Sequence, residues 1–179
     1  MLSLGIDTGR GGAMTQAILC GVSSLIRPDL LVAARGSWLV PGPPRLLDAD
    51  LSAAPEAALP YLRELVEEFA WRADLLVIGS TDIAALYGPA VPPLRIARRL
   101  RASGGGAVLL RCPAPSGAVV SVLICDDPSG RVRADGPADI LFGLAVTPTT
   151  SQLQAALTRE SVPLDATGWL DLADKANAT

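Results

Sequence analysis

The chain has 179 residues, half of them hydrophobic, and a formal net charge of −3. It contains no histidine, which excludes a Ser–His or Cys–His catalytic pair within the chain and removes the commonest transition-metal ligand. The negative charge disfavours nucleic-acid binding, and no apolar run approaches the roughly 20 residues that a membrane-spanning helix needs. We therefore expect a cytoplasmic protein that binds neither nucleic acid nor membrane. Cys20, Cys112 and Cys125 are far apart and odd in number, which predicts reduced thiols.

The first 36 residues have the pattern of a strand, a turn, a helix and a second strand. An apolar run over residues 2–6 stops at the glycine-rich segment Asp7-Thr8-Gly9-Arg10-Gly11-Gly12, which predicts a strand and a sharp turn. Small residues at 13–21 then favour a buried helix, and the apolar run at 29–36 favours a strand. Residues 46–54 are interpreted as a connector.

The middle of the chain predicts two helices and a buried strand between them. Pro55 is suited to open a helix, and apolar residues at helical spacing continue it to about Arg72, namely Leu59, Leu62, Leu65, Val66 and Phe69. Residues 74–79 form a continuous apolar run that is typical of a central parallel strand. A short basic helix is predicted at residues 94–102, with four arginines: Arg95, Arg98, Arg99 and Arg101.

The second half begins with two strands, at residues 107–112 and 118–125, which the Pro/Gly segment between them joins as a hairpin. Residues 140–146 are apolar, but their pattern does not decide between element types. Thr150 or Ser151 can cap a helix that runs to Glu160, and residues 169–173 favour a last strand. Helices and strands alternate, which predicts an α/β domain with a mostly parallel sheet and one antiparallel hairpin. We expect a single domain over residues 1–179, with a candidate internal boundary near residue 104.

Two segments resemble the thiolase superfamily, in particular the β-ketoacyl synthases. In that family a strand leads into a motif of the type Asp-Thr-Ala-Cys-Ser-Ser, and a later strand precedes His-Gln-Ala-Asn. Here Ile6-Asp7-Thr8-Gly9-Arg10-Gly11-Gly12-Ala13 is similar to the first motif, and Trp169-Leu170-Asp171-Leu172-Ala173-Asp174-Lys175-Ala176-Asn177 is similar to the second. The resemblance implies a thiolase-like layered domain of sheet and helices.

The chain departs from that family at the positions that carry its chemistry. Arg10 stands where the family has its nucleophilic cysteine, Asp174 stands where it has its histidine, and Asn177 lies at the matching polar position. Because a cation cannot form a thioester, the resemblance implies a degenerate site with no catalytic residue, metal or cofactor. It leaves open whether the protein is an enzyme at all.

The function that this resemblance implies is a non-catalytic ketosynthase-like subunit in acyl biosynthesis of the fatty-acid or polyketide type. Such a subunit would form a homodimer, or a heterodimer with an active ketosynthase-like chain. The arginines at 95, 98, 99 and 101 could dock an acyl carrier protein, although such a charged face is more often only solvated.

Two alternatives stay open from the residues themselves. Gly-Ile-Asp at the start of the chain is also typical of ribonuclease H-like proteins, and a metal-dependent phosphodiester hydrolase would use Asp7, Asp82 and Asp139. The second alternative is a structural scaffold with no ligand site, in which the glycine-rich segment is only a tight turn.

Overall fold

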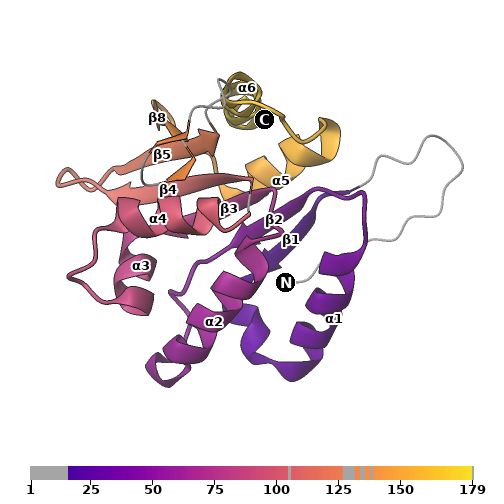
Figure 1. The fold of residues 1–179 in the computed structure, drawn as a ribbon, viewed down its shortest axis with the longest axis vertical. Helices are drawn as coiled ribbons and strands as arrows, with labels where there is room; N and C mark the ends of the chain where they lie inside the picture. The colour runs from indigo at the N-terminus through magenta and orange to yellow at the C-terminus, as the bar shows by residue number, and fades with distance from the viewer. Residues whose placement is uncertain (1–15, 105, 127–131, 134–135, 138, 179) are drawn as a thin grey trace, which may run out of the picture.

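The computed structural model describes residues 16–104, 106–126, 132–133, 136–137 and 139–178. A six-stranded sheet runs through the domain in the order β1-β2-β3-β4-β5-β8 (Figure 1). Neighbouring strands from β1 to β4 are parallel, whereas β5 is antiparallel to both β4 and β8. The strands are β1 (Ile18–Gly21), β2 (Arg45–Asp48), β3 (Leu75–Gly79), β4 (Ala107–Pro113), β5 (Val119–Asp126) and β8 (Asp139–Leu144).

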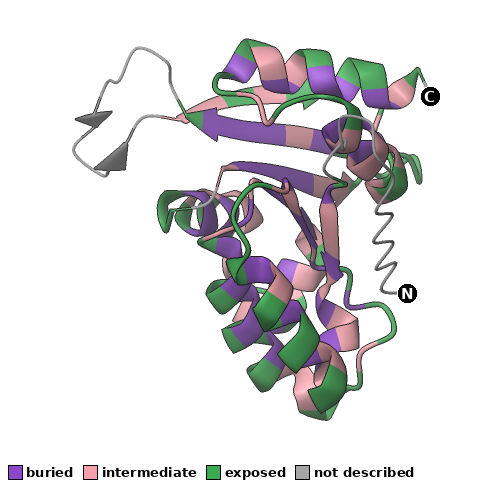
Figure 2. Cartoon of the chain, turned by 90° about the vertical axis from the view of Figure 1, so that its right-hand side faces the viewer, coloured by how far each residue is buried: buried purple, intermediate pink, exposed green. Residues whose placement is uncertain are grey.

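Helices cover both faces of the sheet and enclose two separate hydrophobic cores (Figures 1 and 2). One face carries α1 (Pro28–Leu39), α2 (Leu59–Ala70), α3 (Ser80–Tyr87) and α4 (Pro93–Ala102). The other face carries α5 (Thr150–Arg159) and α6 (Ala166–Asn177). The short elements are η1 (Val22–Ile26), η2 (Glu56–Ala58), β6 (Val132–Arg133) and β7 (Gly136–Pro137).

Strand β3 shows why its sequence is apolar without alternation. Leu76 and Ile78 belong to the core under α1 to α4, whereas Leu75 and Val77 belong to the core under α5 and α6. Because successive side chains of a strand point to opposite faces, a strand covered on both sides needs apolar residues at every position. The prediction of a central parallel strand here is confirmed, because β3 lies between β2 and β4 and is parallel to both.

Several other predictions from the sequence are confirmed. The α/β class, the mostly parallel sheet and the antiparallel hairpin of β4 and β5 are all present. Helices α2, α4 and α5 lie where the sequence predicts them, and Thr149, rather than Thr150 or Ser151, caps α5. Within the described residues, no helix is long and apolar enough to span a membrane.

Three segments form the other kind of element from the one predicted. Residues 18–21 are the strand β1 instead of part of a helix. The segment predicted as a strand at 29–36 lies in α1, whose buried residues Leu31, Ala34 and Trp38 follow helical spacing after a proline in the first turn. The last predicted strand, at 169–173, lies in α6, where Asp165 caps the helix by accepting a hydrogen bond from the Gly168 N–H (2.8 Å).

The structure also contains elements that the sequence pattern did not reveal. Strand β2 lies at the start of the supposed connector, α3 follows directly on β3, and β8 contains most of the undecided apolar stretch. The predicted strand at residues 2–6 and the glycine-rich turn with Asp7 and Arg10 lie outside the described residues.

Candidate functional site

A cleft of about 650 Å³ opens at the carboxyl ends of β2, β3 and β4. This is the edge at which open α/β sheets bind ligands, because the strands end there and the following helices begin there. The first turns of α3 and α5 border the cleft. Its lining includes three acids, one arginine and four threonines: Asp48, Asp50, Asp82, Arg111, Thr81, Thr147, Thr149 and Thr150.

Arg111 is the positive group of the cleft. It lies near the end of β4, and its Nη2 donates to the carbonyl of Pro148 (2.8 Å), while Nη1 lies 3.4 Å from the Thr150 hydroxyl. Its Nε is buried and has no hydrogen-bond partner. Burial lowers the pKa of Arg111, and the negative charges of Asp48 and Asp50 oppose that shift. Arg111 therefore keeps a free donor in a partly desolvated position.

The amino end of α5 lies beside Arg111 and adds backbone donors. Thr149 and Gln152 form a capping box, in which the Gln152 N–H donates to Thr149 Oγ1 (3.3 Å) and the Thr149 N–H donates to Gln152 Oε1 (2.8 Å). The N–H groups of Thr150 and Ser151, in the first turn, have no acceptor within the helix. A cation beside the positive end of a helix is unfavourable by itself. The pair becomes favourable when an anion lies between them.

The acids of the cleft come from two neighbouring strand ends. Asp48 ends β2, and its Oδ1 accepts from the Asp50 N–H (3.3 Å), while Asp50 Oδ1 accepts from the Ser52 N–H (2.9 Å). Asp82 lies in the first turn of α3. Burial raises the pKa of Asp82, its hydrogen bonds from the Leu51 and Gly79 N–H groups lower it, and the charges of Asp50 and Asp48 raise it further.

The residues singled out by the sequence lie largely elsewhere. Asp174 is exposed on α6, and Asn177 of the same helix donates to the carbonyl of Val146 (3.2 Å). Neither lines the cleft. Asp139 begins β8 at the opposite end of the sheet, where it pairs with Arg98 (2.7 Å), so it does not join Asp82. Within the described ranges, no three histidine, cysteine or acidic side chains form a group that could hold a metal ion.

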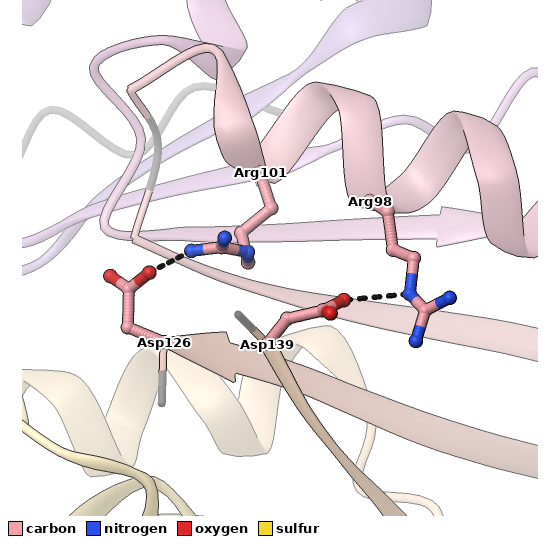
Figure 3. A network of polar contacts seen from close by, with 4 residues as sticks. All are labelled: Arg98, Arg101, Asp126 and Asp139. Carbon is pink, nitrogen blue, oxygen red and sulfur yellow. Dashed lines mark hydrogen bonds and ion pairs between the residues drawn. The ribbon is translucent and has the colours of Figure 1, made fainter. Parts of the chain in front are cut away.

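Three of the four arginines of α4 form ion pairs within the fold. Figure 3 shows Arg98 paired with Asp139 and Arg101 paired with Asp126, both across to the β5–β8 edge of the sheet. Arg99 pairs with Glu67 (2.8 Å), while Arg95 is exposed. Docking of a carrier protein on this helix stays a prediction.

The cleft residues Asp48, Asp50 and Arg111 were missed. A signal for them was present, because Asp48 and Asp50 follow the short apolar pair Leu46-Leu47 and Arg111 ends an apolar run. This signal could have identified the cleft only if β2 had been recognised as a strand and its parallel pairing with β3 had been known.

No family model matches the sequence, and no curated protein is significantly similar to it. Solved structures do share the fold. A PfkB protein from Polaromonas sp. JS666 superimposes with a TM-score of 0.57 at 18% identity, over 90% of this chain and 50% of that one.

Two further structures, both named as kinases, superimpose in the same way. A putative ribokinase II from E. coli has a TM-score of 0.58 at 15% identity, over 91% of this chain and 50% of that chain. The aminoimidazole riboside kinase of Salmonella enterica, solved with aminoimidazole riboside and an ATP analogue, has a TM-score of 0.54 at 16% identity and coverages of 89% and 53%. The chain therefore has a ribokinase-like fold and spans about half the length of these structures.

These similarities correct the family expected from the sequence. The fold is not thiolase-like, so the resemblance to ketosynthases is wrong, together with the fatty-acid or polyketide function that it implied. The ribonuclease H-like hydrolase is wrong as well, since the structural neighbours include sugar and riboside kinases and Asp139 lies away from Asp82. The alternative of a structural scaffold stays a prediction.

Proposed function

We propose that this protein is a kinase of the carbohydrate type, which binds ATP by its phosphate groups in the cleft. It would transfer the terminal phosphoryl group to a hydroxyl of a small polar acceptor. The proposal rests on the ribokinase-like fold and on the position of the cleft at the carboxyl ends of the parallel strands.

The observation that carries the proposal is the environment of Arg111. Its buried Nε has no partner, and two N–H groups of α5 lie beside it without an intrahelical acceptor. A phosphate at this end of the helix would accept hydrogen bonds from the free N–H groups of α5 and would offset the positive charge of the guanidinium. Arginine binds phosphate with a fork of parallel donors, so the residue type suits the ligand.

The acids suit the other requirement of phosphoryl transfer, which is a divalent cation. Mg²⁺ is usually held by one or two carboxylates together with the phosphates of the substrate. Asp48 and Asp50 each use Oδ1 in a bond to the backbone, so each has a second oxygen for a cation or for the proton of an acceptor hydroxyl. ATP, when bound, supplies the phosphoryl group. Arg111 would then offset the negative charge on the oxygens of that phosphoryl group during transfer.

Replacement of Arg111 tests the proposal. Isothermal titration calorimetry with MgATP should give saturable binding to the wild type, and Arg111→Met should weaken it about 10- to 100-fold because a charged hydrogen bond is lost. Arg111→Lys should recover part of the affinity, since lysine keeps the charge and loses the fork. Arg159→Met is the matched control. Arg159 is exposed in the last turn of α5, so this substitution removes the same charge outside the cleft.

Phosphoryl transfer needs its own assay. A coupled ADP-release assay with ribose, fructose and aminoimidazole riboside as acceptors should show turnover that Arg111→Met abolishes. A wild-type protein that does not bind MgATP would overturn the proposal. Binding without turnover on any sugar or riboside acceptor would overturn the transfer step.

A further inference from the structure

Asp82 joins two strand ends that are far apart in the sequence. Its Oδ2 accepts from the N–H of Gly79, at the junction of β3 and α3, over 3.1 Å. Its Oδ1 accepts from the N–H of Leu51, in the loop that follows β2, over 3.2 Å. Both carboxylate oxygens are therefore held by backbone donors. The same loop carries Asp50 and begins at Asp48.

Gly79 allows this arrangement for a steric reason. Its φ of −84° is available to any residue, so the backbone conformation does not require glycine there. A Cβ at position 79, however, would lie 2.5 Å from Asp82 Oδ2. The missing side chain of Gly79 is what lets the carboxylate reach the backbone.

The charge of Asp82 has a cost that a neutral acceptor would avoid. The residue is half-buried, and burial together with the nearby Asp50 and Asp48 raises its pKa. Asp48 and Asp50 also act electrostatically on Arg111, which lies on β4, with β3 between that strand and β2. The loop that Asp82 holds therefore carries the acids that act on Arg111, which is the only arginine among the described residues that line the cleft.

We infer that Asp82 is a positioning residue, which fixes the loop of Asp48 and Asp50 at the cleft and so sets the charge that a ligand phosphate meets at Arg111. The inference rests on the proposed ligand site. Asp82 does not itself face the phosphate as a free group, because both of its oxygens are bonded. Asp82 acts on the ligand indirectly, because its hydrogen bond from the Leu51 N–H fixes the loop that carries Asp48 and Asp50.

Hydrogen exchange of the free protein tests the first step. Asp82→Asn leaves one of the two N–H groups without an acceptor, since an amide has only one oxygen. Gly79→Ala keeps the carboxylate of Asp82 but pushes it away from the backbone at position 79. It therefore tests the same hydrogen bonds if Asp82→Asn does not fold. In either variant at least one of the Leu51 and Gly79 amides should exchange about fivefold faster or more, as expected for the loss of one hydrogen bond. Asp165→Asn is the matched control, because Asp165 caps α6 by a similar bond and lies outside the cleft.

Ligand affinity tests the second step, with inorganic phosphate and MgATP as the probes. Asp82→Asn should weaken MgATP about tenfold, as is usual for residues that orient a ligand-binding group, and Asp165→Asn should not. In the otherwise wild-type protein, Asp50→Asn should strengthen the binding of phosphate, because it removes a negative charge near Arg111. That gain should shrink when Asp82 is already replaced, since the loop is then no longer held. A structural role alone would leave the gain unchanged.

The outcomes separate this inference from the proposed function. Unchanged exchange of both the Leu51 and the Gly79 amide in folded Asp82→Asn and Gly79→Ala would overturn the positioning role, and so would an equal effect of Asp50→Asn in both backgrounds. If the wild type binds neither phosphate nor MgATP, the proposed function fails. The exchange of these two amides then decides alone whether Asp82 holds the loop.

Discussion

Arg101 is a buried charge at the end of the sheet opposite the cleft. Its side chain is 4% exposed, whereas its partner Asp126 is 70% exposed, and its Nε has no hydrogen-bond partner. Asp126 lies directly opposite Asp139 across β5 and β8. Two like charges at such a position repel each other, and Figure 3 shows how Arg101 and Arg98 of α4 each neutralise one of them.

This arrangement predicts an asymmetry between the two partners of the pair. Asp126→Asn leaves the buried guanidinium without its counter-charge, and it should lower the free energy of unfolding by about 1–3 kcal/mol. Adding Arg101→Met removes the buried charge and the unpartnered Nε, so the double variant should recover most of that loss. Urea unfolding of the wild type, both single variants and the double variant measures the effect. A double variant less stable than Asp126→Asn would contradict the account.

At the scale of the element, α5 depends on its capping box. Thr149 Oγ1 accepts from the Gln152 N–H, and Gln152 Oε1 accepts from the Thr149 N–H. Thr149→Ala removes the first of these, and it should destabilise the protein by about 1 kcal/mol, the usual value of an N-cap. Thr149→Ser keeps the hydroxyl and should cost much less. Denaturant titration compares the two. Equal losses for alanine and serine would point to the lost methyl group instead of the cap.

The elements also differ in how far the sequence could predict them. Helix α2 has a clear apolar stripe, and the apolar run of β3 has the length of a strand, so both were predicted. In α1 the segment from Leu30 to Ala34 is apolar on all sides and resembles a strand. Its helical spacing becomes visible only when Trp38 is included. In α6 the spacing of Trp169, Leu172 and Ala176 was present, but the supposed family motif favoured a strand.

The cleft could not be predicted by the same means. It depends on the order of β2, β3 and β4 in the sheet, which sets Asp48 beside Asp82 and Arg111 beside both. The bond between Asp82 and Leu51 spans 31 residues. No local pattern encodes such a contact, because each residue alone is ordinary turn or capping chemistry.

At the scale of the whole molecule, the two cores each contain a group that can ionise only in alkali. Cys20 lies in the core under α1 to α4, and Cys125 lies in the core under α5 and α6. Burial raises the pKa of each thiol from 9.0 to about 12. Burial also raises the pKa of Tyr87, which packs against the first core, from 10.0 to about 12. Unfolding would return all three groups to their ordinary values.

These groups predict how stability depends on pH. Each folded pKa is above the unfolded value, so the stability is fully present below about pH 9 and is lost as the pH rises from there to about 12. Near pH 7 to 8 the free energy of unfolding should be nearly constant, because the chain has no histidine. Above pH 10 it should fall by up to about 1.4 kcal/mol per pH unit for each of the three protons. Urea unfolding under reducing conditions measures how steeply the free energy of unfolding falls with pH. Cys125→Ser should reduce this slope by the contribution of about one proton. A slope unchanged by this substitution would show that Cys125 is not the buried thiol that the fold makes it.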